Sequence, residues 1–157
     1  MNTNNISLRH TLATLAYRGN RALRGAAPEF GVFQIGTTTR QPVQILAHIG
    51  DLMDWALSIA DGKETWHNAK PLPWEQEVAR FFAALSALDR RLEAGPLECS
   101  PEKLFQGPIA DALTHVGQIS MLRRLAGCSA GGENFAVAQI AVGRTGPDQA
   151  KPIREFD

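Results

Sequence analysis

Apolar residues recur at intervals of three and four positions in four separate stretches of this chain, each bounded by proline or glycine. This spacing is typical of helices that bury one face against a core. It predicts four helices, over about residues 8–24, 42–61, 73–94 and 108–126. Because no convincing sheet lies between these stretches, the pattern predicts an all-α four-helix bundle.

Residues at the ends of these stretches support the predicted limits. Ser7 is a suitable N-cap for the first helix, and Pro42 and Pro73 suit the first turns of the second and third helices. Gly107-Pro108 is expected to interrupt the last helix or to restart it, because proline cannot donate the hydrogen bond that continues a helix. We therefore expect the half of this helix that carries polar residues to begin at Pro108.

The chain is long enough for one hydrophobic core, so we expect residues 1–157 to form a single domain. Residues 133–157 are expected to form an irregular or extended C-terminal strap. The 16 basic residues balance the 16 acidic ones, so no overall field favours nucleic acid or a membrane surface. The absence of a long apolar run and of signal-peptide features predicts a cytoplasmic protein. Cys99 and Cys128 are expected to be free thiols, with a disulfide between them left open.

Two histidines and one aspartate fall on the core-directed faces of two predicted helices. His48 lies in the apolar stripe of residues 42–61, and Asp111 and His115 are four residues apart and therefore share a helix face. Taken singly, His48 can be explained as a hydrogen-bonded core histidine, and Asp111 and His115 can be explained as an Asp–His hydrogen bond without a metal. Together they offer two nitrogens and one oxygen and leave positions open for water or substrate, which is the pattern of a catalytic divalent-metal site. Zinc, nickel, iron and manganese are all compatible with this set.

Three neighbouring residues are candidates for supporting roles. Asp51, one turn from His48, could orient that imidazole, although an exposed surface carboxylate is the simpler interpretation. Trp55 lies on the same stripe and is a candidate pocket wall, with core packing an equally good explanation. Gln118 shares the helix face of the predicted ligands on the last helix and is a candidate for the second shell or the pocket.

The segments ILAHIGDLMDWAL and GPIADALTHVGQISMLRRLAG, which contain these residues, resemble the DinB/YfiT-like superfamily of metalloenzymes. The ending NFAVAQIAVGRTGPDQ resembles the C-terminal stretch of some members. The resemblance implies a four-helix bundle whose metal is held by three side chains, typically all histidine. His48, Asp111 and His115 occupy those positions, and Gly117-Gln118 matches a step that members usually show. Asp111 departs from the usual histidine, which favours harder metals or a weakened site.

The resemblance also implies a type of activity, because some members are transferases or isomerases that use a low-molecular-weight thiol. The leading hypothesis is a divalent-metal-dependent enzyme, such as a thiol-dependent transferase or a hydrolase, in which a metal-bound thiol or water attacks a small-molecule substrate. The alternative is a non-catalytic helical module for ligand binding or dimerisation. It is favoured by a second apolar face, formed by Ile109, Leu113 and Val116, that the strap or a partner must cover. A homodimer is therefore expected.

Overall fold

The structure of the chain is a computed structural model that describes residues 3–156, and helices dominate it. The all-α prediction is therefore confirmed. The four long helices are α1 (Thr3–Leu23), α2 (Pro42–Ala60), α3 (Trp74–Glu93) and α5 (Ala110–Leu125). The shorter elements are η1 (Pro28–Val32), α4 (Pro101–Leu104), η2 (Phe105–Ile109), β1 (Gly132–Glu133), η3 (Phe135–Val137) and β2 (Glu155–Phe156).

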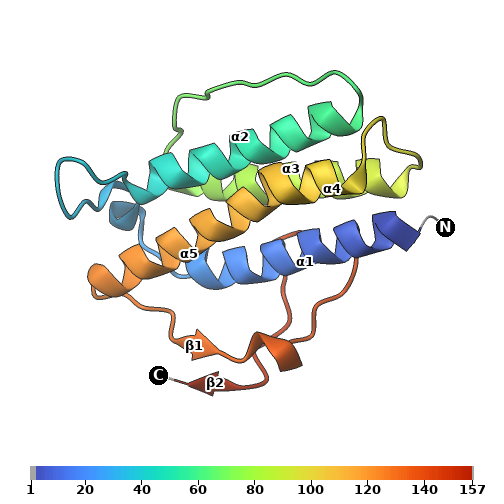
Figure 1. Cartoon of the computed structure of the whole chain (residues 1–157). Coiled ribbons are helices and arrows are strands. Elements are labelled where there is room, and N and C mark those ends of the chain that lie inside the picture. Colours follow the sequence, from blue (N-terminus) through green and yellow to red (C-terminus); the bar gives the residue numbers. More distant parts are fainter. Residues whose placement is uncertain (1–2, 157) are drawn as a thin grey trace.

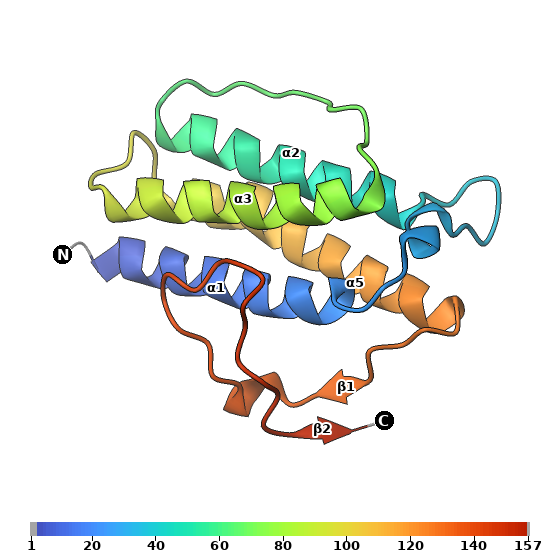
Figure 2. The same ribbon diagram turned by 180° about the vertical axis from the view of Figure 1, so that it is seen from behind.

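The helices form a bundle in which α1 and α5 run in one direction and α2 and α3 in the other (Figures 1 and 2). Helix α2 packs against α3 and α5, and α1 packs against the same two helices on the other side of the core. Consecutive helices that run parallel need a connection as long as the bundle. Residues 61–73 provide it as an exposed loop that arches outside α2.

The core is built from the apolar faces that the helical spacing identified. Phe81 in α3 is fully buried, and the α1 backbone approaches its ring at Gly19, where a methyl group would overlap the ring. Glycine at this position therefore allows α1 and α3 to pack closely. Other fully buried side chains are Leu12, Leu15, Leu46, Ile49, Met53, Ile59, Leu85, Leu88, Leu92, Leu104 and Ile109.

The observed limits of α2 and α3 agree with the predicted ones to within one residue, but the first helix begins earlier than predicted. Helix α1 starts at Thr3 rather than at residue 8, so Ser7 is a helical residue and not an N-cap. The Asn5 amide donates hydrogen bonds to the carbonyl oxygens of Leu92, at 2.9 Å, and Gly95, at 3.0 Å. These bonds hold the additional first turn of α1 against the end of α3.

The interruption expected at Gly107-Pro108 is a π-helical turn and not a break in the helix. Helix α4 runs through the π-helical turn η2 directly into α5, and Pro108 lies inside that turn. Proline has no N–H, and its ring crowds the carbonyl four residues earlier in an α-helix. A wider π turn accommodates such a residue without ending the helix. The Ser100 side chain caps the start of α4 by accepting a hydrogen bond from the Lys103 N–H, at 3.3 Å.

Residues 133–156 are mostly irregular, as expected, and lie beside α1 (Figures 1 and 2). Their regular parts are Glu133 of β1, the single turn η3, and strand β2, which pairs antiparallel with β1. The Ser86 and Thr145 hydroxyls lie 2.9 Å apart, so this strap reaches α3 as well. Asp157, the last residue of the predicted strap, lies outside the described residues.

Two further expectations concern the membrane and the cysteines. Among residues 3–156, no helix is both long and apolar enough to span a membrane. Cys99 and Cys128 are free thiols and partly buried. The expectation of two free thiols is therefore confirmed.

Candidate metal centre

The packing of α2 against α5 brings His48, Asp111 and His115 together. His48 comes from the first half of α2, and the other two side chains lie one turn apart near the start of α5. Asp111 lies between the imidazoles, with Oδ2 3.6 Å from Nε2 of His48 and Oδ1 3.4 Å from Nε2 of His115. One ligand atom from each residue lies within 4.8 Å of the others, so these three side chains could hold a metal ion.

The spacing of the ligand atoms fits a divalent ion. With metal–nitrogen bonds of about 2.1 Å, two ligands of a tetrahedral zinc ion lie about 3.4 Å apart. Both histidine–aspartate separations are close to this value. The two imidazole rings are 4.8 Å apart between centroids and nearly perpendicular. Three protein ligands leave coordination positions open for water or substrate.

The histidines are more protected from solvent than the aspartate. The exposed fractions of the side chains are 24% for His48, 13% for His115 and 47% for Asp111. Burial lowers the pKa of His48, the nearby His115 lowers it further, and Asp111 opposes these effects. The lowered pKa favours the neutral imidazole at neutral pH, and only the neutral form can bind a metal.

Gln118 orients the imidazole of His115. The Nδ1–H of His115 donates to Oε1 of Gln118 at 2.8 Å. A proton held on Nδ1 leaves Nε2, the atom nearer to Asp111, with a free lone pair. Hydrogen bonds of this kind fix the tautomer and the ring orientation of metal-binding histidines. The position of Gln118 therefore suits the supporting role expected of it.

Asp51 is buried, with an exposed fraction of 5%, so its interpretation as an exposed surface carboxylate is wrong. It accepts hydrogen bonds from Arg80, at 2.6 Å, and from the backbone N–H of Ala69, at 3.1 Å. Within the described residues its side chain makes no hydrogen bond to His48. Asp51 instead ties the loop of residues 61–73 to α2 and α3.

Trp66 belongs to this loop and covers His48. The two rings meet edge to face with centroids 5.7 Å apart, and Trp66 packs in the same way on Trp55, also at 5.7 Å. Trp55 therefore supports the cover over the histidine. Trp66 belongs to no helical face, so helical spacing gives no indication of its position. A tryptophan in a mostly polar loop is the one signal that the sequence offers.

An open cleft of about 580 Å³ lies beside the two histidines. Ile45, Met121 and Leu122 give it an apolar wall, and Arg40 stands at its edge. Arg40 also lines a smaller cavity that borders His48, and it adds to the lowering of the pKa of that histidine. The candidate metal site is thus open to small molecules.

Comparison with models of known protein families, with curated proteins and with solved structures gives no match. The convergence of His48, Asp111 and His115 beside an open cleft is therefore the observation from which a function is proposed.

Proposed function

We propose that this chain is a divalent-metal-dependent enzyme of the DinB-like type, with the metal held by His48, Asp111 and His115. One observation carries the proposal: three ligand atoms from two helices lie within 4.8 Å of one another at the edge of a cleft. An Asp–His pair alone has a simple structural explanation. A second histidine, brought from another helix to the same carboxylate, is better explained by a shared cation.

The residues present fit a divalent ion, because imidazole nitrogen and carboxylate oxygen are both common ligands of such ions. When bound, the ion would supply a nucleophile near neutral pH by lowering the pKa of a coordinated thiol or water. The carboxylate of Asp111 favours harder ions such as manganese or iron more than a third histidine would.

The protein residues around the site would position the reactants. Gln118 keeps Nε2 of His115 available, and Trp66 limits the access of solvent to His48. Ile45 and Met121 offer an apolar surface to a substrate in the cleft. A thiol-dependent transferase acting on a small molecule is the specific form of enzyme that we propose.

The apolar face that favoured a non-catalytic module is covered within the chain. Ile109 is fully buried, Val116 has an exposed fraction of 6%, and Leu113 packs against the core. Helix α1 lies against α5 on this side. Most of this face is therefore covered within the chain, Leu113 being partly exposed, and the homodimer stays a prediction.

The proposal is tested by elemental analysis of the purified chain beside His115→Ala and Asp111→Ala. We expect a divalent ion in near-stoichiometric amount in the wild type and its loss in both variants. His10→Ala, which alters an exposed histidine on α1, is the matched control and should retain the ion. The proposal fails if the wild type holds no ion and if added zinc, nickel or manganese leaves its Tm unchanged.

A further inference from the structure

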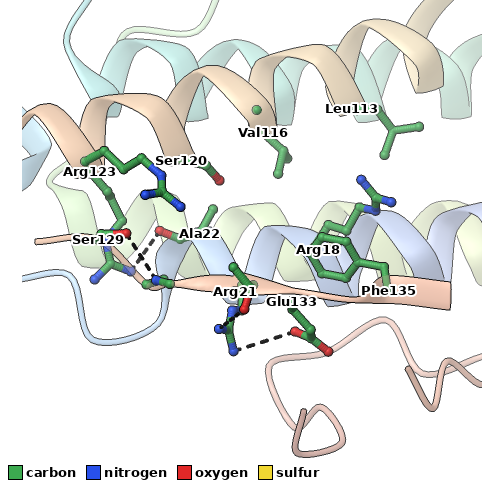
Figure 3. A pocket seen from close by; sticks show the side chains of 15 residues that line it. Arg18, Arg21, Ala22, Leu113, Val116, Ser120, Arg123, Ser129, Glu133 and Phe135 are labelled. Atoms are coloured by element: carbon green, nitrogen blue, oxygen red, sulfur yellow. Dashed lines mark hydrogen bonds and ion pairs between the residues drawn. The ribbon is translucent and has the colours of Figure 1, made fainter. Parts of the chain in front are cut away.

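A second cavity, of about 200 Å³, lies between α1 and α5 (Figure 3), and none of His48, Asp111 and His115 lines it. Leu113, Val116 and Ser120 of α5 form one wall, and α1 forms the facing wall. The start of the C-terminal strap, through Glu133 and Phe135, closes a third side. The cavity is therefore a feature separate from the cleft beside the histidines.

Positive charge is concentrated in this cavity although the whole chain has a formal net charge of zero. Its lining contains the four arginines Arg18, Arg21, Arg123 and Arg124, and Glu133 is its one carboxylate. Arg21 forms ion pairs with Glu133, at 3.6 Å, and with Glu155 of β2, at 3.2 Å. Even when both of these carboxylates are counted, the arginines are in excess by two charges.

Arg123 is a buried cation that has no carboxylate partner among the described residues. Its exposed fraction is 5%, and its guanidinium donates to the carbonyl oxygens of Cys128, Ala22 and Arg24 at 2.9 to 3.2 Å. These bonds engage Nε and Nη1 and leave the charge of the group unbalanced. A buried charge without a counter-ion is costly, so an anion in the cavity would be stabilised by Arg123.

Arg18 offers free hydrogen-bond donors to such an anion. Its guanidinium carbon lies 4.2 Å from the centre of the Phe135 ring, which holds the group by a cation–π contact. Figure 3 shows this guanidinium extending between the helices toward Leu113. Within residues 3–156 the side chain has no hydrogen-bond acceptor. Its donors are therefore available to a ligand beside an apolar wall.

We propose that this cavity binds a small organic anion. The carboxylate or phosphate head lies near Arg18, the apolar body lies against Leu113 and Val116, and Arg123 adds positive charge from the other end of the cavity. Guanidinium groups suit either head, because both present paired oxygens. Pockets for drug-sized ligands have volumes of about 300–1,000 Å³, so this smaller cavity selects a correspondingly small molecule. The proposal involves none of the candidate metal ligands and stands independently of the proposed function.

The test measures binding of three probes to the full chain by isothermal titration calorimetry. The probes are benzoate, phenyl phosphate and the neutral benzyl alcohol. The protein is first treated with a chelator and dialysed, so that an anion cannot bind through a metal ion. We expect at least one anionic probe to bind and benzyl alcohol to bind at least about tenfold more weakly, because a guanidinium binds a charged acceptor more strongly than a neutral one. The stronger of the two anions identifies the preferred head.

Arg18→Gln removes the free guanidinium from an exposed position, so the fold should be retained, which circular dichroism checks. We expect this variant to bind the anionic probe about tenfold or more weakly than the wild type. Arg90→Gln removes an exposed arginine from α3, outside the cavity, and should bind as the wild type does. The proposal is overturned if neither anion binds or if benzyl alcohol binds equally well. It is also overturned if a folded Arg18→Gln binds as tightly as the wild type, or if Arg90→Gln loses as much affinity.

Discussion

Gln118→Met tests the candidate metal centre without altering any proposed ligand. Methionine is similar in length to glutamine and favours a helix equally well, but it lacks the amide oxygen that accepts the Nδ1–H of His115 at 2.8 Å. The imidazole of His115 then loses the bond that fixes its tautomer and its ring orientation. We expect weaker metal binding and an otherwise unchanged protein.

The expected loss of affinity follows from the exposure of this hydrogen bond. Removal of the partner of a metal-binding histidine typically costs 10–100-fold in metal affinity, or about 1.4–2.7 kcal/mol. Because Gln118 is exposed, water can take over the acceptor role in part. We therefore expect a loss near the lower limit, about tenfold. The free energy of unfolding of the metal-free protein should change by less than about 0.5 kcal/mol, as for other surface substitutions.

The assay is a titration of the metal-free protein with manganese or zinc, with a competing chelator where binding is tight. Gln76→Met, at an exposed position of α3, is the matched control and should bind metal as the wild type does. Unchanged affinity in Gln118→Met would refute the orienting role. A loss of affinity with an equal loss of stability would show instead that Gln118 supports the fold.

Three further predictions concern the fold and the choice of metal. Gly19→Ala should lower the free energy of unfolding, measured in urea, by about 1–3 kcal/mol, because the new methyl group overlaps the buried ring of Phe81. Gly117→Ala should raise it by about 0.5–1 kcal/mol in the same assay, because the new methyl group meets no atom within 4 Å. Burial, and then the hydrogen bond to Glu133, raise the pKa of Tyr17 to about 12, so the stability that this group contributes should be complete below pH 10 and lost as the pH rises through 12. Measurements of the free energy of unfolding from pH 9 to 12 should show this loss in the wild type and not in Tyr17→Phe. Asp111→His should raise affinity for zinc relative to manganese in a competition titration, because imidazole suits zinc better than carboxylate does.

The helices were predictable where local residues determine them. The limits of α2 follow from its apolar stripe and from Pro42 in its first turn, and those of α3 follow from its own apolar stripe and from Pro73, which precedes it. The start of α1 depends instead on Asn5, whose side chain caps the end of α3, a contact that links residues far apart in sequence. Gly107-Pro108 predicts an interruption of the last helix, but no local pattern shows whether it is a break or the π turn that the structure has.

The positions of the site residues on their helices were also predictable, whereas their surroundings were not. Spacing of four residues gives Asp111 and His115 one face, but that face meets His48 only because α5 packs beside α2. The burial of Asp51 depends on Arg80, which comes from α3. Trp66 lies in a loop without periodicity, so its position over His48 is fixed by tertiary contacts.

The cover over His48 follows from the topology of the bundle. Parallel α2 and α3 require the long connection of residues 61–73, which passes outside α2. Two buried carboxylates hold its second half: Asp51 accepts the N–H of Ala69 at 3.1 Å, and Glu77 accepts that of Leu72 at 2.9 Å. Arg80 forms ion pairs with both carboxylates and so offsets their charge. The ion pairs that stabilise the crossover loop thus also favour the position of Trp66, and access to the candidate metal site is linked to the packing of α2 and α3.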